Sequence, residues 1–284
     1  MAGGREVALS KFPEPGIRPI CVTDCFRRLV IKGLLRHCQD EIDNFFQNSH
    51  PRAFQFGGGN PRGATNMFHL LAGLSEGMKN ENISDVYRED PMVICTTDIE
   101  NAFNRLDRKA MLDFFAKGCD QHVHTLRANT NEGGSSRQIR GWDILWPYMQ
   151  AFYGTQGELR VYQGGETSII QSQTGFQQGC GLGSSGYALT TFPPILRTVN
   201  SVDGVLIGAF ADNIAIAGRW SQVQKAVDKL HSEFHQMGLR FNERECLVYI
   251  PNCAQSEGSF RRHLENTKFI RLKRGSRREK RGTV

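Results

Sequence analysis

The chain has 284 residues, of which 39% are hydrophobic and 10% aromatic, a composition typical of a globular protein and unlike that of a disordered chain. No run approaches the roughly 20 apolar residues that span a bilayer, and the N-terminus lacks the apolar core of a secretory signal. The net charge of +6 comes entirely from residues 271–284, which hold seven Lys or Arg and one Glu. We therefore expect an intracellular globular protein whose basic tail, residues 253–284, is disordered and serves nuclear import or nucleic-acid contact.

The eight cysteines do not indicate a metal site. None forms a C-x-x-C pair, and Cys21 and Cys25 have no second Cys or His pair nearby that would complete a zinc site. A disulfide framework is not expected either, because thiols stay reduced inside cells. We expect reduced, mostly buried thiols and no structural metal.

The spacing of apolar residues predicts a chain that mixes helices and strands. Asp24 or Thr23 is expected to cap the first helix, and the polar residues 127–140 to form a mobile loop. In chain order we predict strands at residues 6–9 and 18–22, helices at 25–38 and 64–78, a strand at 91–97, a helix at 108–117, a hairpin over 157–172, a helix ending near 199, a hairpin over 205–217, a helix at 221–237 and a strand at 247–250. This order favours an α/β or α+β class.

Two acidic residues lie where predicted strands end. Asp98 directly follows the strand at residues 91–97, and Asp212 lies in the turn of the hairpin over 205–217. If these elements are neighbours in one sheet, the two carboxylates converge on one point. Paired carboxylates are the usual ligands of two Mg²⁺ ions that activate a hydroxyl and stabilise both oxygens of an in-line phosphoryl displacement. For either residue alone, a plain turn or cap role is the better explanation.

Six short segments follow one another between residues 5 and 252. They are RPI at residues 18–20, followed by Arg27, Arg28 and Lys32; QFG at 55–57, followed by GA at 63–64 and His69; DIENAFN at 98–104; TGFQQG at 174–179; FADN at 210–213; and GLRFN at 238–242, followed by Cys246. Each segment alone is a weak signal, whereas chance rarely supplies the whole ordered set. In wording and order they resemble the reverse transcriptases of retroelements, particularly of non-LTR retrotransposons.

The resemblance implies an α+β fold with the fingers and palm of a right-hand polymerase, the palm being a small antiparallel sheet backed by helices. The fingers would occupy residues 1–90 and the palm, with finger insertions, residues 91–252, and nothing after about residue 251 resembles a thumb. The implied activity is RNA-directed DNA polymerisation, in which a primer 3′-hydroxyl attacks the α-phosphate of a dNTP. The implied partners are an RNA template, a DNA primer, dNTPs and other domains of a retroelement protein, and the implied cofactor is Mg²⁺, with Mn²⁺ as an alternative.

The resemblance also implies roles for individual residues. The catalytic set would be Asp98, Asp212 and Asn213, and the metal ligands would be Asp98, Asp212 and the backbone carbonyl of Ile99. The residues expected around the nucleotide are Arg18, with Arg27 or Lys32, and Ile99, Ala102, Phe103, Gln178 and Gly179. The template is expected to contact Gln55, Arg62 and Gly63. Phe103 would be the steric gate whose ring excludes a ribose 2′-hydroxyl, with a plain core aromatic as the alternative.

Four positions, in three segments, depart from the family's pattern. Asn213 replaces the second aspartate of the F/Y-x-D-D box, Cys180 and Gly181 replace the Asp-Pro that follows QG, and Glu245 replaces a lysine. These departures leave open a catalytically impaired relic that binds nucleic acid. An RNA-dependent RNA polymerase is a further alternative, since some viral enzymes carry Asp-Asn in this box, but Phe103 and the RPI segment argue against it. A structural α/β protein with incidental acidic turns requires the ordered motifs to be coincidence.

Overall fold

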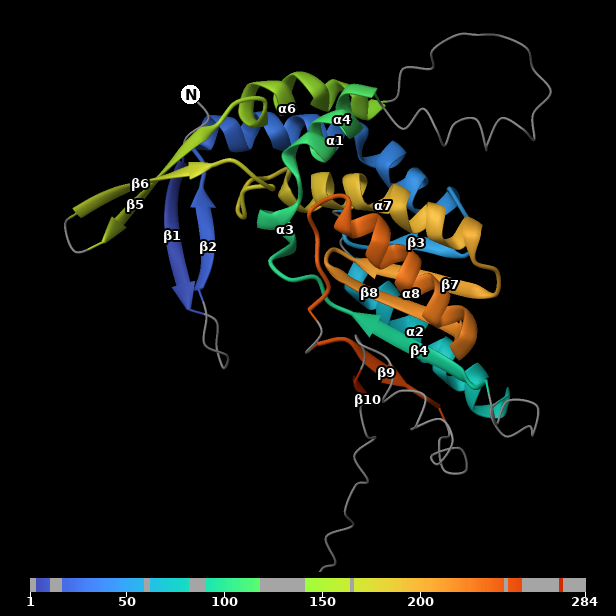
Figure 1. Ribbon diagram of the computed structural model, residues 1–284. Helices are drawn as coiled ribbons and strands as arrows, with labels where there is room; N and C mark the ends of the chain where they lie inside the picture. The colour runs from blue at the N-terminus through green and yellow to red at the C-terminus, as the bar shows by residue number, and fades with distance from the viewer. Residues whose placement is uncertain are drawn as a thin grey trace, which may run out of the picture.

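The computed structural model describes residues 4–10, 17–58, 62–81, 90–117, 141–163, 166–242, 245–251 and 271–272. The predicted loop at residues 127–140 lies outside this part of the chain, as does the tail at 253–284 apart from two residues. The described residues form two sheets of unequal size with helices packed on them (Figure 1). None of the described helices is long and apolar enough to cross a membrane.

The larger sheet has six strands. In chain order these are β3 (Ala53–Gln55), β4 (Met92–Thr97), β7 (Val205–Phe210), β8 (Asn213–Arg219), β9 (Leu247–Tyr249) and β10 (Arg271–Leu272). They lie in the order β10-β9-β4-β8-β7-β3. The three central pairs are antiparallel, whereas the short edge strands β3 and β10 run parallel to their neighbours. The predicted small antiparallel sheet is therefore confirmed in its four central strands, and its two short edge strands differ by pairing in parallel.

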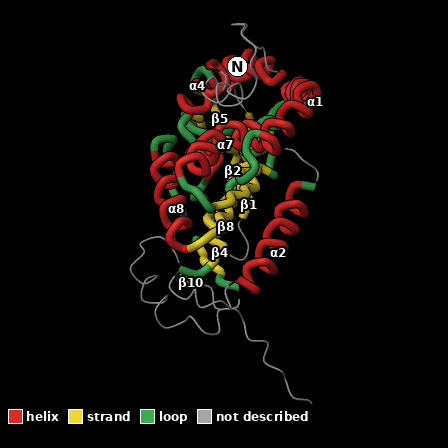
Figure 2. The backbone as a smooth tube through the Cα atoms, turned by 90° about the vertical axis from the view of Figure 1, so that its right-hand side faces the viewer, coloured by secondary structure: helices red, strands yellow, loops and turns green. Residues whose placement is uncertain are grey.

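Helices cover both faces of this sheet, because its central strands are apolar on both sides. The helices are α2 (Gly63–Glu81), α7 (Gly183–Ser201) and α8 (Trp220–His235). Along β4, Val93 belongs to the main core, which includes most of α7 and the buried side of α8. Its neighbour Ile94 points to the opposite face, where it packs with Met67 of α2. Figure 2 shows α2 and α8 on opposite sides of the strands, so the helical backing expected of a palm is present.

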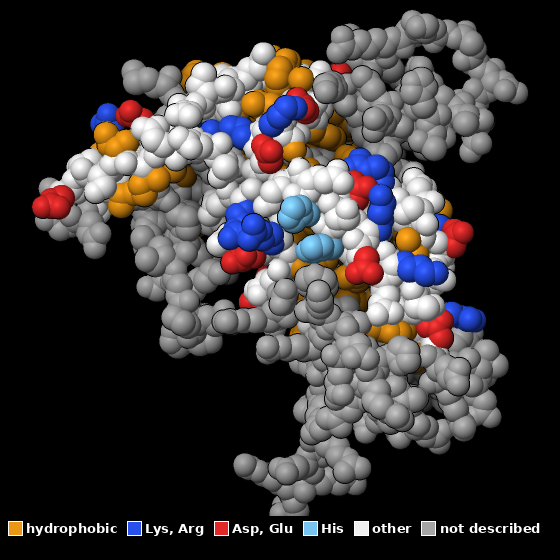
Figure 3. Space-filling model, in the orientation of Figure 1, with side chains coloured by type: hydrophobic (Ala, Val, Ile, Leu, Met, Phe, Trp, Pro, Cys, Tyr) orange, Lys and Arg blue, Asp and Glu red, His pale blue; other side chains and the backbone are white. Residues whose placement is uncertain are grey.

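The smaller sheet joins two hairpins that are far apart in the sequence. Its strands are β1 (Gly4–Ser10), β2 (Ile17–Val22), β5 (Gly157–Gln163) and β6 (Glu166–Ser172), in the order β2-β1-β5-β6. Each hairpin is antiparallel, and β1 pairs with β5 in parallel. Figure 1 shows this sheet beside the larger one, and Figure 3 shows hydrophobic side chains gathered on the β5–β6 hairpin. Half-exposed apolar or aromatic side chains on it are Tyr162, Ile169 and Ile170.

The long helix α1 (Cys25–Asn48) follows directly on β2. Asp24 caps it as predicted, since an Asp24 carboxylate oxygen accepts a hydrogen bond from the Arg27 backbone N–H at 2.7 Å. The helix continues well past the predicted end at residue 38. Ile42 and Phe46 are both buried and extend the apolar stripe at four-residue spacing through an otherwise polar segment.

Four further elements complete the described fold: α3 (Ala102–Arg105), α4 (Arg108–Lys117), the 3₁₀ helix η2 (Gly141–Ile144) and α6 (Leu145–Tyr153). The sequence predicts α4 with the observed bounds. The predicted elements do not include α3, η2, α6 or the short strand β3. Three of these, α3, η2 and β3, are too short to establish a period, whereas α6 carries buried apolar residues at helical spacing, Leu145, Tyr148, Met149 and Tyr153. The α6 helix packs against both α1 and α4.

The two sheets do not follow the predicted boundary at residue 90. Both β3 and α2 come from residues 1–90, yet they belong to the larger sheet and its covering layer. Conversely, β5 and β6 lie within residues 91–252 and join the N-terminal hairpin in the smaller sheet. Of the tail, Arg271–Leu272 is described and adds a strand beside β9.

The cysteines of the described part are mostly core residues. Six are described, and all of these except Cys25 are buried, with no disulfide among them. Burial raises the pKa of the Cys38 thiol to about 11, so this thiol is neutral and poorly nucleophilic. Their burial agrees with the predicted core thiols.

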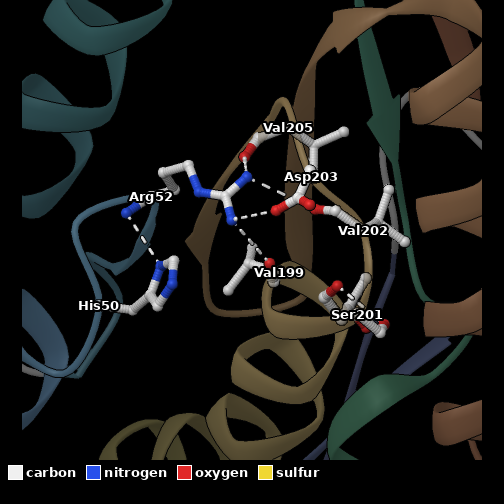
Figure 4. A network of polar contacts seen from close by, with 8 residues as sticks. His50, Arg52, Val199, Ser201, Val202, Asp203 and Val205 are labelled. Carbon is white, nitrogen blue, oxygen red and sulfur yellow. Dashed lines mark hydrogen bonds and ion pairs between the residues drawn. The ribbon is translucent and has the colours of Figure 1, made fainter.

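Arg52 ties β3 to the connection between α7 and β7 (Figure 4). Its guanidinium donates hydrogen bonds to the carbonyls of Val199 at 3.0 Å and of Val202 and Val205 at 3.5 Å. It also pairs with the Asp203 carboxylate at 3.3 Å. A cation that satisfies carbonyls where a helix ends is favourable, because those carbonyls have no partner within the helix. Arg52 thereby fixes the start of β3 on the larger sheet.

Candidate functional site

The structure brings Asp98 and Asp212 to the same end of the larger sheet. Strands β4 and β8 are antiparallel, with Thr97 opposite Ile214. Asp98 therefore follows the last paired residue of β4, beside the start of β8. Asp212 lies in the turn that joins β7 to β8, next to Asn213, which opens β8. The strand register thus places both residues at one end of the sheet, which is what the hypothesis of converging carboxylates requires.

The turn that carries Asp212 is a tight one. Phe210 pairs with Asn213, which leaves a two-residue turn, and its first residue, Ala211, has φ of 54°. That value is uncommon for a residue with a side chain and favours glycine. The backbone of Gly57 packs against this turn, since a Cβ on Gly57 would lie 2.2 Å from the Ala211 nitrogen. The QFG segment therefore contacts this turn, and no residue larger than glycine fits at position 57.

The GLRFN segment lies beside Asp98. Asn242 donates its backbone N–H to the Asp98 carbonyl at 2.9 Å and its side-chain amide to the Asp98 carboxylate at 3.4 Å. An isolated antiparallel bridge joins Ile99 to Phe241. Since residues 98 and 100 make the flanking hydrogen bonds, the Ile99 carbonyl points away from the GLRFN segment. That orientation is compatible with its predicted role as a ligand.

Negative charge is concentrated around Asp98. Burial, then the nearby charge of Glu245 and a smaller contribution from Asp212, raise the pKa of the Asp98 carboxyl to about 6. The hydrogen bond from Asn242 opposes this shift. Carboxylates that repel one another in a partly buried place become more stable when a cation binds between them. The electrostatics of the site therefore favour a bound cation.

Asn213 is exposed at the start of β8, next to Asp212. Its side-chain amide lies 3.5 Å from an Asp212 carboxylate oxygen, at the limit of a hydrogen bond. In this arrangement the amide nitrogen, and not the oxygen, faces the carboxylate. Asn213 thus adds no charge to the site.

The described residues can supply part of the coordination shell of a hard divalent cation. Within the described residues, no group of three or more His, Cys, Asp or Glu side chains is placed to hold a metal ion. The ligands available are the carboxylates of Asp98 and Asp212 and the carbonyl of Ile99. Mg²⁺ is often held by one or two carboxylates and completes its shell with water and substrate phosphates, so this oxygen set suits it.

The predicted gate residue lies next to the carboxylates. Phe103 is partly buried against the main core, and Ala102 before it is fully buried. The Phe103 ring packs on the ring of Tyr187 in α7, with centroids 4.9 Å apart and planes inclined by 35°. The Phe103 carbonyl accepts a hydrogen bond from the Phe176 backbone N–H at 2.7 Å, which joins DIENAFN to TGFQQG. Sequence motifs gave no indication of Tyr187, which lies in an apolar helix segment.

Gln178 and Gly179 cross the end of β2 closely. The Gln178 carbonyl accepts from the Cys21 backbone N–H at 2.6 Å. Gly179 has φ of 94°, and a Cβ there would lie 2.4 Å from the Cys21 carbonyl oxygen. Glycine is therefore required at this crossing. The crossing fixes the TGFQQG segment against the strand that carries Arg18; the side chain of Arg18 lies outside the described part.

The Arg27 side chain is not available to a nucleotide. Arg27 and Lys32 are the two alternatives expected to bind the nucleotide together with Arg18, and the structure rules out Arg27. The Arg27 side chain is buried; its guanidinium donates to the Tyr148 hydroxyl at 3.0 Å and to the Gln177 side-chain oxygen at 2.9 Å. It also lies 4.3 Å from the centroid of the Phe152 ring. Arg27 holds α1, α6 and the TGFQQG segment together. Lys32, the other alternative, is exposed.

The residues expected to contact the template belong to the segment beside the β7–β8 turn that carries Asp212. Gln55 is buried, and its side-chain oxygen accepts a hydrogen bond from the Gly57 backbone N–H at 2.8 Å. A Cβ on Gly63 would lie 1.9 Å from the Phe56 carbonyl oxygen, so that position also requires glycine. Arg62 is exposed. Gln55 and Gly63 therefore shape this segment, and Arg62 is the one of the three whose side chain faces solvent.

No family model matches the sequence, and no curated protein matches it. Solved structures of telomerase resemble the fold. An apo telomerase from Candida tropicalis truncated from its C-terminal domain is 12% identical, with a TM-score of 0.58, and the match covers 90% of this chain and 51% of that chain. A telomerase from Candida albicans in complex with the TWJ fragment of telomeric RNA is 12% identical, with a TM-score of 0.55, and the match covers 89% and 43% of the two chains.

The chain thus spans about half, or less, of the length of these telomerases. At such low identity the likeness establishes the fold and nothing finer. The match covers 90% of this chain. The chain therefore has a reverse-transcriptase-like fold composed of fingers and palm.

Proposed function

We propose that this chain carries out template-directed nucleotidyl transfer, in which a primer 3′-hydroxyl attacks the α-phosphate of a dNTP and pyrophosphate leaves. The observation that carries the proposal is the meeting of Asp98 and Asp212 at one end of the palm sheet. Two carboxylates placed there, in a reverse-transcriptase-like fold, fit phosphoryl transfer better than any other chemistry the described residues offer.

Asp98, Asp212 and the Ile99 carbonyl would hold Mg²⁺ or Mn²⁺. When bound there, such ions lower the pKa of the attacking hydroxyl and neutralise the charge that develops on the phosphate oxygens. Asn242 orients the Asp98 carboxylate through its side-chain amide. Asn213 would contribute at most a neutral oxygen, which lowers the affinity for cations relative to a second aspartate without removing the site.

The nucleotide would bind between the gate and the TGFQQG segment. The Phe103 ring, backed by Tyr187, would exclude a ribose 2′-hydroxyl and so select dNTPs. Gln178 and Gly179 would lie beneath the incoming nucleotide, where glycine lets the backbone approach closely. Arg18 would hold the triphosphate through charge-assisted hydrogen bonds.

The natural partners proposed are an RNA template and a DNA primer. The template would run along the loop that contains Gln55, Arg62 and Gly63. One of the solved telomerases is a complex with an RNA fragment, which supports an RNA partner for this fold. The wording of the motifs points to a non-LTR retroelement, and the basic tail at residues 271–284 points to the nucleus.

A second candidate is a catalytically impaired module that binds nucleic acid. Asn213 favours it, because the site holds one carboxylate fewer than the family's box. Retained binding of divalent cations at Asp98 and Asp212 separates the active enzyme from this alternative.

Primer extension tests the proposal. A DNA primer on an RNA template is incubated with Mg²⁺ or Mn²⁺, with dNTPs and NTPs supplied separately, for wild type, Asn213→Asp and Asp98→Asn. We expect extension with dNTPs by wild type, faster extension by Asn213→Asp and none by Asp98→Asn. Extension by Asn213→Asp alone identifies a polymerase disabled at one charge. No extension by wild type or by Asn213→Asp, with folded protein confirmed, rejects the proposal and favours the binding module. Extension with NTPs alone indicates an RNA polymerase.

A further inference from the structure

Tyr187 carries a buried hydroxyl without a hydrogen-bond partner in the described structure. The residue lies in the first half of α7, and its side chain is completely inaccessible to solvent. The hydroxyl oxygen makes no hydrogen bond with any described residue. Burying a hydroxyl without a partner costs roughly 1–3 kcal/mol, so a phenylalanine of nearly the same shape would be more stable here.

The charges of the two carboxylates act on this hydroxyl. Burial, and then the charges of Asp212 and Asp98, raise the pKa of the Tyr187 hydroxyl well above its ordinary value. Both carboxylates therefore lie within electrostatic reach of the hydroxyl, and at neutral pH it keeps its proton and can donate. The Tyr187 ring packs on Phe103, so the same side chain contacts the proposed gate residue, which follows Asp98 by five positions.

We infer that Tyr187 is a positioning residue of the carboxylate pair: its hydroxyl donates a hydrogen bond to a carboxylate oxygen of Asp98 or Asp212 when the pair holds a divalent cation. The inference rests on the proposed function, since it requires that the pair bind a cation. Ionised carboxylates accept hydrogen bonds and cannot donate them, so a neutral hydroxyl is the complementary group. Donors behind metal ligands fix the orientation of those ligands, and their removal typically costs about 10–100-fold in metal affinity.

Tyr187→Phe has different expected effects on cation binding for a structural and for a positioning tyrosine. A purely structural tyrosine gives a variant with unchanged or higher stability and unchanged cation binding, because the substitution only removes an unpaired hydroxyl. A positioning tyrosine also gives unchanged or higher stability without metal, but weaker cation binding. The ring, and with it the packing on Phe103, is retained in both cases.

The experiment titrates the full chain with Mn²⁺, follows the unbound ion by electron paramagnetic resonance, and measures urea unfolding of the same samples without metal. We expect Tyr187→Phe to raise the Mn²⁺ dissociation constant about tenfold or more, with no loss of stability. Tyr153→Phe is the matched control, since its hydroxyl is also buried but lies beside Arg27 and Cys180. It should leave Mn²⁺ binding unchanged.

An unchanged dissociation constant in Tyr187→Phe, or an equal change in Tyr153→Phe, overturns the inference. Asp98→Asn distinguishes this failure from failure of the proposed function. If Asp98→Asn weakens Mn²⁺ binding and Tyr187→Phe does not, the cation site stands and the role of Tyr187 is rejected. If Asp98→Asn has no effect either, the cation site itself is wrong.

Discussion

Arg108 holds Ser172 with two hydrogen bonds, one to its backbone carbonyl and one at 3.0 Å to its hydroxyl. The same guanidinium donates to the carbonyls of Thr174 at 3.2 Å and Gly175 at 3.4 Å. Arg108 opens α4, whereas Ser172 ends β6. A single side chain therefore fixes the point at which the β5–β6 hairpin passes into the TGFQQG segment.

Arg108→Ala should destabilise the fold and weaken dNTP binding together. Its removal leaves several carbonyls without their donor, a loss of about 1–3 kcal/mol in the free energy of unfolding. The displaced TGFQQG segment should also raise KM for dNTPs more than it lowers kcat. Urea unfolding and steady-state extension measure the two effects. Lys109→Ala is the control, because the Lys109 side chain forms an exposed ion pair with Asp113, and its loss should change neither quantity appreciably. Equal effects from both variants contradict the role of Arg108.

Replacement of Phe103 by valine should relax the discrimination against ribonucleotides. The smaller side chain leaves room for the 2′-hydroxyl, and the ratio of kcat/KM for dNTP over NTP should fall by about tenfold or more, as for other changes of pocket size. Phe103→Tyr keeps the ring and should keep the preference. If valine leaves the ratio unchanged while both variants remain folded, Phe103 is a core aromatic and not a gate.

Arg27→Lys should affect stability and not nucleotide binding. The buried guanidinium contacts Tyr148 and Gln177 at once, which a lysine cannot reproduce. We expect a loss of about 1–3 kcal/mol in the free energy of unfolding and an unchanged KM for dNTPs. Lys32→Ala, at an exposed position of the same helix, should leave stability unchanged. A raised KM in Arg27→Lys without loss of stability would place Arg27 on the triphosphate instead.

The raised pKa of Asp98 predicts opposite effects of pH on cation binding and on stability. Because the folded pKa of about 6 lies above the ordinary value of 3.8, the folded state holds its proton more tightly than the unfolded state. Stability without metal should therefore fall as pH rises through the window between these two values. Mn²⁺ affinity should instead rise with pH until Asp98 is ionised, near and above pH 6.

Glu245→Gln tests the cause of that shift. Removal of the Glu245 charge should lower the pKa of Asp98, and the pH midpoint of Mn²⁺ binding should move down with it. Glu243→Gln serves as the control for a change of net charge in the same segment. A midpoint that stays in place in Glu245→Gln contradicts the assigned electrostatics.

Local patterns in the sequence predict most elements and the acidic pair. Asp98 and Asp212 follow apolar strand runs, and the ordered motifs identify the sheet end that they share. Pairing between β1 and β5 is not predictable, because it joins short strands that are distant in the chain. The burial of Arg27 is not predictable from the sequence either. Arg27 belongs to an apparent basic cluster, yet it lies on the buried side of its helix. Tyr187 belongs to no motif, and only the packing of α7 against Phe103 reveals it.

The central claim is that Asp98 and Asp212 hold one divalent cation together, and a double-mutant cycle of Mn²⁺ binding tests it most directly. Asp98→Asn, Asp212→Asn and the double variant are titrated with Mn²⁺, with Asp203→Asn, an exposed aspartate beside Arg52, as the control. We predict that each single variant loses most of the binding and that the double variant is little worse, because either change removes the shared site. Additive losses, or binding as strong as in the control, would contradict the claim.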